Sequence, residues 1–175
     1  ILLITNYKFA VGRNVGETQI TTEDGIEVFQ EEKYYLLKKN VEIQSDEFNL
    51  VGQLVKIYFD KDLYDIIELH AKEDVNFISE IYNIKGKGDT LTFNFKDQKI
   101  NVIGLNSELF LETTEMYSNG SIKVDNINGS FLLEGTNSKL VSDNILIIGS
   151  KIIGVFDVIN GKRNIKNLEV EDNKI

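Results

Sequence analysis

The sequence predicts an all-β protein made of repeated antiparallel strands, and three observations lead to this prediction. The first is composition: with 23 Ile, 13 Val, 10 Phe and 7 Tyr, β-branched and aromatic residues make up about 30% of the chain, the kinds of residue that favour strands. The second is the scarcity of Ala, the best helix former, which occurs twice in 175 residues. The third is a strict alternation of apolar and polar residues, which is the period of a strand whose one face is buried.

The alternation is clearest in residues 40–44, 55–60 and 91–96. Turn-forming residues separate these stretches at short intervals, so we expect strands of about 5 to 8 residues joined by hairpins. The expected turns are Ser45-Asp46-Glu47, Asp60-Lys61-Asp62, Gly86-Lys87-Gly88, Lys96-Asp97-Gln98, Asn119-Gly120, Asn128-Gly129 and Asn160-Gly161.

An internal repeat organises these stretches. Residues 40–52 align with residues 74–86 at an offset of 34, with apolar residues falling on apolar residues. After a two-residue insertion the repeat continues, with 55–59 matching 91–95 and 66–69 matching 102–105, and a looser third copy starts near Leu109 and Leu111. Repeats of this length are typical of stacked units that bury one continuous core, so we expect an elongated molecule.

The length and the net charge of the chain limit the classes of function that it can have. The chain fits a single domain over residues 1–175, and its strand-like last stretch, residues 168–175, leaves room for a further C-terminal portion. The net charge of −9 argues against nucleic acid as a partner, because an acidic surface repels a phosphate backbone. Cysteine is absent, which excludes disulfides, thiolate zinc sites and Cys nucleophiles.

The N-terminal residues do not show to which compartment the chain is targeted. The apolar run Ile1–Ile4 is too short to cross a bilayer or to act as a signal sequence. We therefore expect either a cytoplasmic chain or one whose targeting segment precedes Ile1.

Residues 20–28, 34–43 and 48–60 resemble the LptA/OstA-like family of lipopolysaccharide-transport proteins. The family repeats a Gly-Asn-Val phrase followed by apolar-polar alternation, and here its Asn-Val element appears as Asn40-Val41 and Asp74-Val75. The family glycine is replaced by Lys39 and Glu73. The resemblance covers about residues 20–160 and does not separate three branches: the periplasmic bridge LptA, its membrane-anchored relative LptC and the N-terminal part of LptD.

The resemblance implies a half-open jelly roll of two antiparallel sheets, located in the periplasm. Its seam would hold the acyl chains of lipopolysaccharide, without catalysis and without a cofactor. It also implies head-to-tail association with related domains or with further copies of the chain through edge strands. The residues alone give a physical reason for such pairing, because the ends of a strand array carry unpaired N–H and C=O groups.

The inward side chains of the alternating strands are the candidates for lipid contact. Buried apolar surface contributes about 0.8 kcal/mol for each CH₂ group, so one acyl chain can bind without a specific polar contact. The same residues could equally fill a closed sandwich core, because periodicity does not distinguish an open seam from a packed one. The candidates are Val41, Ile43, Phe48, Leu50, Val55, Ile57, Phe59, Val75, Phe77, Ile84, Leu91, Phe93, Phe95, Leu109 and Leu111.

Four lysines beside predicted strand ends, Lys38, Lys39, Lys85 and Lys87, could meet the phosphates of a lipid headgroup. The plainer interpretation is that they are solvated turn lysines.

Other chemistry is poorly represented in the sequence. His70 is the single histidine, which cannot build a multi-His metal site, so no metal is expected. Paired acids such as Asp46-Glu47 fall mainly at predicted turns.

Two alternatives to a lipid carrier stay open. One is a structural β-solenoid or sandwich module with a closed core that self-associates through its edges. The other is a glycan-cleaving β-solenoid with two cleft acids about 5 to 9.5 Å apart.

Overall fold

The computed structural model describes residues 14–143, 145–159 and 162–171. In these ranges the chain forms twelve strands and no helix, which confirms the all-β prediction; accordingly, none of the described elements is a helix able to cross a membrane. The strands are β1 (Gln19–Thr21), β2 (Ile26–Phe29), β3 (Tyr34–Gln44), β4 (Asn49–Phe59), β5 (Ile66–Ser79), β6 (Ile84–Asn94), β7 (Lys99–Ile103), β8 (Ser107–Leu111), β9 (Thr114–Asp125), β10 (Ser130–Ser142), β11 (Ile145–Ile159) and β12 (Lys162–Glu171).

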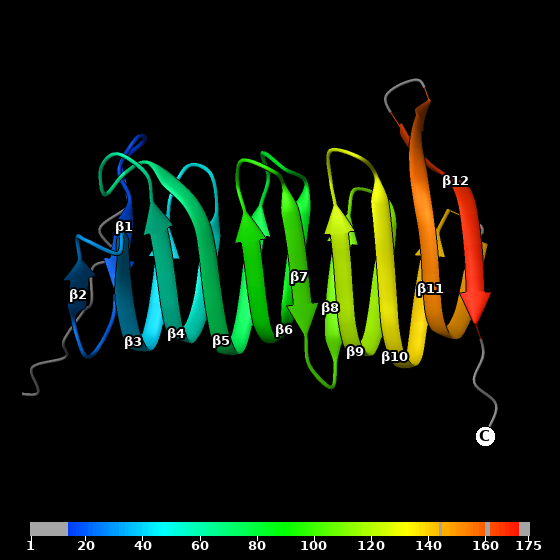
Figure 1. Cartoon of the computed structure of the whole chain (residues 1–175), viewed down its shortest axis with the longest axis horizontal. Coiled ribbons are helices and arrows are strands. Elements are labelled where there is room, and N and C mark those ends of the chain that lie inside the picture. Colours follow the sequence, from blue (N-terminus) through cyan, green and yellow to red (C-terminus); the bar gives the residue numbers. More distant parts are fainter. Residues whose placement is uncertain (1–13, 144, 160–161, 172–175) are drawn as a thin grey trace, which may run out of the picture.

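The strands are hydrogen-bonded into one antiparallel sheet that is folded onto itself. Its order is β1-β3-β4-β5-β6-β7-β9-β10-β11-β12, while β2 pairs with β3, and β8 pairs with β6 and β9. The pairing register of the long strands shifts in mid-strand, for example between Lys38 and Val41 in β3 and between Lys72 and Val75 in β5. Each long strand therefore crosses from one layer to the other, and the result is an elongated two-layer array (Figure 1).

The two layers can be followed from these registers. The first layer contains β2, β7 and β12 and the strand halves paired with them, such as residues 34–38 of β3 and 54–59 of β4. The second layer contains β1 and β8 and the other halves, such as residues 41–44 and 49–52. The chain bends from layer to layer along one long side, at the bottom of Figure 1, and this side is called the bend edge below.

The two copies of the sequence repeat place equivalent positions at the bend edge. Lys39 and Asn40 have φ of 59° and 47°, and the matching Glu73 and Asp74 have φ of 63° and 52°. Non-glycine residues rarely adopt this left-handed conformation, and Asn and Asp tolerate it better than most. The Asn-Val element of the repeat is therefore the corner at which β3 and β5 change layers.

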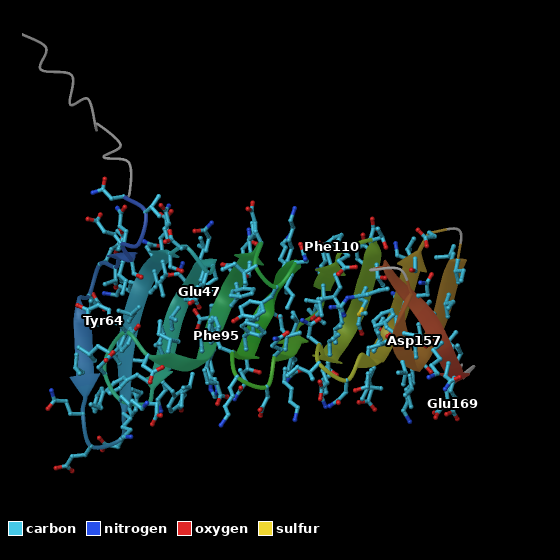
Figure 2. The ribbon with its side chains drawn as sticks, turned by 90° about the horizontal axis from the view of Figure 1, so that it is seen from above. Glu47, Tyr64, Phe95, Phe110, Asp157 and Glu169 are labelled. Atoms are coloured by element: carbon cyan, nitrogen blue, oxygen red, sulfur yellow. The ribbon has the colours of Figure 1, made fainter. Side chains whose placement is uncertain are left out.

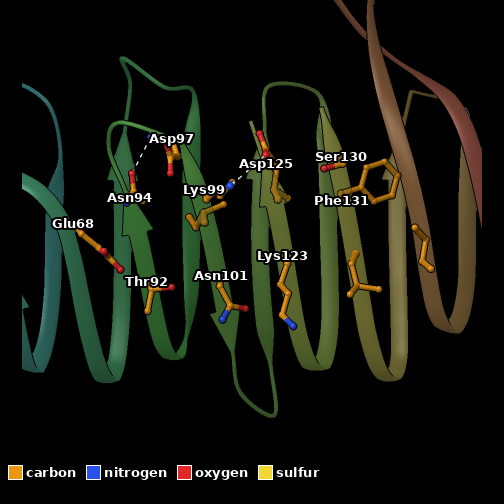
Figure 3. Close-up of a pocket in the computed structure, with 14 residues that line it drawn as sticks. Glu68, Thr92, Asn94, Asp97, Lys99, Asn101, Lys123, Asp125, Ser130 and Phe131 are labelled. Carbon is orange, nitrogen blue, oxygen red and sulfur yellow. Dashed lines mark hydrogen bonds and ion pairs between the residues drawn. The ribbon is translucent and has the colours of Figure 1, made fainter. Parts of the chain in front are cut away.

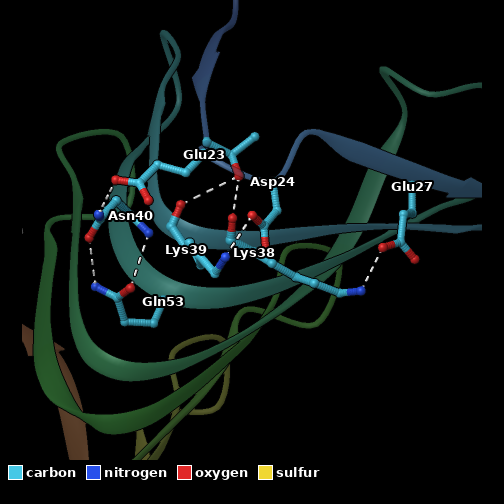
Figure 4. Close-up of polar contacts among 8 residues, drawn as sticks. Glu23, Asp24, Glu27, Lys38, Lys39, Asn40 and Gln53 are labelled. Carbon is cyan, nitrogen blue, oxygen red and sulfur yellow. Dashed lines mark hydrogen bonds and ion pairs between the residues drawn. The ribbon is translucent and has the colours of Figure 1, made fainter.

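Side-chain hydrogen bonds stabilise the corner in β3 (Figure 4). The Asn40 backbone N–H donates to Gln53 Oε1 at 3.0 Å, and Gln53 Nε2 donates to Asn40 Oδ1 at 3.1 Å. The first contact satisfies the Asn40 backbone N–H, which the broken strand register leaves unpaired, and the second holds the two side chains together.

The bends within the long strands show that the predicted strand lengths and two of the predicted turns are wrong. Most long strands have 11 to 15 residues rather than 5 to 8, because a bend, not a turn, joins their halves. For the same reason Gly86-Lys87-Gly88 and Asn119-Gly120 are not hairpin turns: they lie inside β6 and β9.

Four of the five remaining turn predictions agree with the described strands. The turns at residues 45–47, 60–62, 96–98 and 128–129 are confirmed, since each joins two consecutive strands. The turn expected at Asn160-Gly161 lies outside the described residues.

The described hairpin turns gather along the other long side, at the top of Figure 1. The first layer contributes the turns at residues 30–33, 60–65, 95–98 and 126–129, and the second layer those at 45–48, 80–83 and 112–113. This side is called the mouth, because the layers meet there through side chains rather than through continuous backbone. Figure 2 looks onto it from above.

Candidate lipid-binding seam

The fifteen apolar candidates all point into the seam between the two layers. Each is at most 8% exposed, and all belong to one continuous hydrophobic core. Alternation along the strands places them there, since successive side chains of a strand point to opposite faces. In the described structure they contact one another as a packed core, so an acyl chain could lie among them if the layers moved apart.

Aromatic side chains close the mouth over β4 to β6. Phe48 ends a turn of the second layer, and Phe95 follows the first-layer half of β6; their ring centroids lie 5.3 Å apart. Tyr82, from the second-layer turn between β5 and β6, lies 6.2 Å from Phe95 and 5.3 Å from Phe93. Phe48, Tyr82 and Phe95 are called the aromatic clasp below. Figure 2 shows Glu47, beside Phe48, and Phe95 in the middle of the mouth.

A polar contact crosses the mouth nearer the C-terminal end. Arg163 Nε in β12 lies 3.4 Å from Glu112 Oε1 in the second-layer turn between β8 and β9. The same guanidinium donates through Nη2 to Asn126 Oδ1, in a first-layer turn. Arg163 is 13% exposed and Glu112 31%, so this ion pair is screened less than a fully exposed one.

An apolar pocket of about 200 Å³ opens at the N-terminal end of the seam. It is called the vestibule below, and Tyr64 marks its position in Figure 2. Tyr35 belongs to the core, and Ile20 and Ile66 pack against that core, so the vestibule adjoins the N-terminal end of the seam. The lining residues are Thr18, Ile20, Ile26, Val28, Tyr35, Leu63, Tyr64 and Ile66.

Sequence reasoning missed the vestibule because its walls come from β1, β2, β3 and the turn between β4 and β5. A usable signal was present: the predicted turn at Asp60-Lys61-Asp62 is followed by Leu63 and Tyr64, which are 41% and 88% exposed. Neighbouring exposed apolar side chains mark a candidate surface when they join further apolar residues in a contiguous patch, as Leu63 and Tyr64 do with Ile26 and Val28.

The four candidate lysines are not brought together. Lys38 pairs with Glu27, and Lys39 Nζ lies 2.9 Å from Asp24 Oδ1 at the bend edge (Figure 4). This contact with Asp24 raises the pKa of Lys39. Lys85 and Lys87 lie on the outer face of the second layer, where they alternate with buried Ile84 and Gly86. Lys38 and Lys39 lie at the bend edge, whereas Lys85 lies beside the mouth turn at residues 80–83 and lines an outer pocket with Glu80, Asn83 and Glu112.

Burial changes the acidity of two tyrosines along the seam. The pKa of Tyr35 is raised to about 12 because its hydroxyl is desolvated inside the core. Burial also raises the pKa of Tyr82, with a further contribution from the negative charge of Glu47.

A wider hollow of about 580 Å³ lies on the outer face of the first layer (Figure 3). Thr92, Asn101 and Lys123 are cross-strand neighbours along it. Asn101 Oδ1 is buried and has no hydrogen-bond partner in the described structure. Apolar side chains complete the lining, namely Ile100, Val124, Phe131, Leu132 and Ile153, and none of the fifteen candidates lines the hollow.

The remaining titratable residues form no recognisable reactive cluster. His70 Nε2 lies 2.6 Å from Glu68 Oε1, on a strand and beside the Tyr58 ring. Within the described ranges no group of three or more His, Asp or Glu side chains could hold a metal ion. The paired acids Asp46-Glu47 lie in a mouth turn, while Glu73-Asp74 lie in a bend.

Comparison with known proteins identifies the fold. No protein-family model matches the chain, and no curated protein matches it. Among solved structures, the chain is similar to the crystal structure of LptH from Pseudomonas aeruginosa, described as the LptA homologous periplasmic component of the conserved lipopolysaccharide transport device. The TM-score is 0.51 and the sequence identity 12%, over 76% of this chain and 82% of that chain. The two-layer antiparallel array described here is thus an LptA-like jelly-roll fold.

Proposed function

We propose that the chain is a non-enzymatic carrier that holds the acyl chains of lipopolysaccharide between its two layers. The observation that carries the proposal is the seam itself: a continuous apolar interior, closed by backbone at the bend edge, closed by side chains at the mouth, and opening into an apolar vestibule. The likeness to LptH, a periplasmic transport component, supports the same function and a periplasmic location.

Apolar burial supplies the binding energy in this proposal. Each CH₂ group buried contributes about 0.8 kcal/mol, so affinity grows with the length of acyl chain that enters the seam beyond the vestibule. The net charge of −9 gives no long-range attraction for an anionic lipid. Since Lys38 and Lys39 already pair with carboxylates, the phosphorylated sugar head would stay in solvent at the mouth.

The ends of the array provide surfaces for end-to-end association with a second copy or a related domain. At the C-terminal end, residues 145–149 of β11 pair with β10, while β12 pairs with residues 151–159, so no described strand pairs with the other edge of residues 145–149. Ile145, Leu146 and Ile148 are 49%, 62% and 64% exposed there. An uncovered edge with apolar side chains favours pairing with another strand. Such pairing would align the seams of successive domains.

A structural module with a closed core is the second candidate, and the low exposure of all fifteen seam residues favours it. The two candidates differ in one property, because a carrier must bind acyl chains and a closed module must not.

Equilibrium binding of purified lipopolysaccharide to the chain tests the proposal. Fully deacylated lipopolysaccharide is the matched control, since it keeps the sugars and phosphates and lacks the acyl chains. The carrier predicts that intact lipopolysaccharide binds and the deacylated form does not. Equal binding of both forms, or binding of neither to folded protein, contradicts it.

A further inference from the structure

We propose that the aromatic clasp of Phe48, Tyr82 and Phe95 is a gate in the mouth, and that acyl chains pass the middle of the seam when it opens. This inference rests on the proposed function and adds to it a place, in the turns flanking β4 and β6, where the two layers separate.

The positions of the three rings support this assignment. Phe48 and Tyr82 come from second-layer turns, whereas Phe95 comes from the first layer, so their contacts join the layers across the mouth. Behind them lie Phe77 and Phe93, which are fully buried and 5.3 Å apart. The clasp is therefore the outermost part of an aromatic cluster that fills the seam from mouth to interior.

The backbones that hold the rings are fixed. Phe48 is held in its turn because its N–H donates to Ser45 Oγ at 3.0 Å and the Ser45 N–H donates to the Phe48 carbonyl at 3.0 Å. The Phe95 N–H donates to the Ile67 carbonyl at 2.9 Å. Each of these hydrogen bonds joins groups of the same layer, so separating the two layers at the clasp leaves them intact.

The two long sides of the seam resist opening very differently. At the bend edge the layers are covalently continuous through β3, β4, β5 and β6, with strand hydrogen bonds on either side of the bend. At the clasp they meet through ring contacts, which need no hydrogen bond to be broken. A seam built in this way opens at the mouth, with the bend edge acting as the hinge.

The location of the clasp gives it control over passage. The vestibule lies at the β1–β3 end, and the core residues of β7 to β11 lie on the far side of the cluster. Figure 1 shows β4 to β6 between these two regions. An acyl chain moving along the seam from the vestibule has to displace the Phe95 ring.

The test compares two phenylalanines that differ in their partners. Phe95→Ala removes the ring that crosses the mouth. Phe131→Ala is the matched control, because Phe131 is also buried at the mouth end of a first-layer strand, but its ring partner, Phe156 at 4.5 Å, belongs to the same layer. Phe95→Leu is added to keep apolar volume should Phe95→Ala fail to fold.

Two readouts separate opening from lipid binding. The first is the release rate of a lipopolysaccharide carrying a fluorescent acyl chain, measured by displacement with unlabelled lipopolysaccharide. The second needs no lipid: spin labels at Glu47→Cys and Lys96→Cys, exposed neighbours of Phe48 and Phe95 on opposite turns, report the width of the mouth. The chain has no other Cys to label.

The gate predicts that Phe95→Ala speeds release about tenfold and adds a longer distance between the labels, with Phe95→Leu intermediate. Phe131→Ala should leave both readouts near those of the unmodified chain. Equal effects of Phe95→Ala and Phe131→Ala, or bound lipid whose release Phe95→Ala and Phe95→Leu leave unchanged, overturn the gate without touching the proposed function. If no variant binds lipid but the label distance widens in Phe95→Ala, the opening stands and the proposed function falls.

Discussion

The rings of Phe48 and Phe95 lie 5.3 Å apart although the two residues belong to opposite layers of the sheet. Their contact closes the mouth at a point where no backbone hydrogen bond joins the layers. On the other long side, the same layers are joined by the bent strands themselves. The seam can therefore open at the mouth without loss of strand pairing, whereas opening at the bend edge would break strand hydrogen bonds.

The corner at Asn40 should not tolerate a β-branched residue. Asn40→Val places a β-branched residue at φ of 47° and removes the hydrogen bonds of the Asn40 side chain with Gln53 and Glu23, so we expect the free energy of unfolding to fall by about 2 kcal/mol or more. Denaturant unfolding measures this change. Asn49→Val, at an exposed position in the extended part of β4, is the control and should change stability by about 0.5 kcal/mol or less. Similar losses in both variants would mean that the corner geometry is unimportant.

Close packing at the bend edge should make Gly120 irreplaceable. A Cβ atom at Gly120 would lie 2.2 Å from the Glu134 carbonyl oxygen in β10, and backbone atoms do not yield as a flexible side chain does. We expect Gly120→Ala to lower the free energy of unfolding by about 1–3 kcal/mol. At Gly52, in another bend, the nearest atom would be 3.5 Å away, so Gly52→Ala should be tolerated better in the same thermal unfolding experiment. The reverse order would contradict the bend geometry.

Stability should fall at acid pH partly because of Asp125. Its carboxylate accepts hydrogen bonds from the backbone N–H of Asn128 at 2.9 Å and of Ile127 at 3.2 Å, and from Asn128 Nδ2 at 2.8 Å. The Asn128 N–H is the main cause that lowers the pKa of Asp125 below 3.8, with a smaller contribution from Lys99. The stabilisation is therefore complete above pH 3.8 and is lost as the pH falls through the lowered pKa of the folded state.

The variant Asp125→Asn tests this linkage. It should cost about 1 kcal/mol at pH 7, with the difference from the unmodified chain shrinking below pH 3.8. Chemical unfolding between pH 2 and pH 7 measures both values. Asp97→Asn, at an exposed turn position, is the control. A difference that grows as the pH falls would show that the sign of the linkage is wrong.

Self-association, if it proceeds through the second-layer edge, should depend on Leu146 and Ile148. The double variant Leu146→Lys and Ile148→Lys places two charges on an uncovered edge, and we expect the dissociation constant between copies to rise about tenfold or more. Sedimentation velocity over a range of concentrations measures it. The control, Ile103→Lys with Leu105→Lys, removes two residues that are 43% and 73% exposed between β7 and β8, away from the ends. Equal weakening by both double variants would place the contact elsewhere.

The sequence predicted the fold class more reliably than the strand lengths. Alternation and the 34-residue repeat led to the antiparallel array, and the repeat positions Asn40 and Asp74 are equivalent corners. The turn predicted at Gly86-Lys87-Gly88 is wrong because small residues serve two purposes. They form turns, and they also leave room where one strand bends back on itself, as at Gly86 in β6, where a Cβ would lie 2.8 Å from Cδ1 of Leu91 in the other half of the same strand.

The contacts across the seam could not be predicted from strand periodicity. Period two identified Phe93 and Phe95 as inward-facing residues, and both are buried. It could not tell that Phe95 meets Phe48 from the other layer, because the distance between layers depends on contacts between segments far apart in the chain. The vestibule escaped prediction for the same reason, since Ile20, Val28 and Tyr64 meet only after the sheet has folded over.

Site-specific photo-crosslinking to lipopolysaccharide tests the central claim most directly. A photoreactive aromatic residue is placed in turn at Phe93, at Phe95 and at Asn94, which lines the outer hollow between them in sequence (Figure 3). The account predicts crosslinks at Phe93 and Phe95 and none at Asn94, because lipid enters the seam. No crosslink at Phe93 or Phe95 in folded protein, or equal crosslinking at Asn94, would contradict a lipid-accepting seam and favour the module with a closed core.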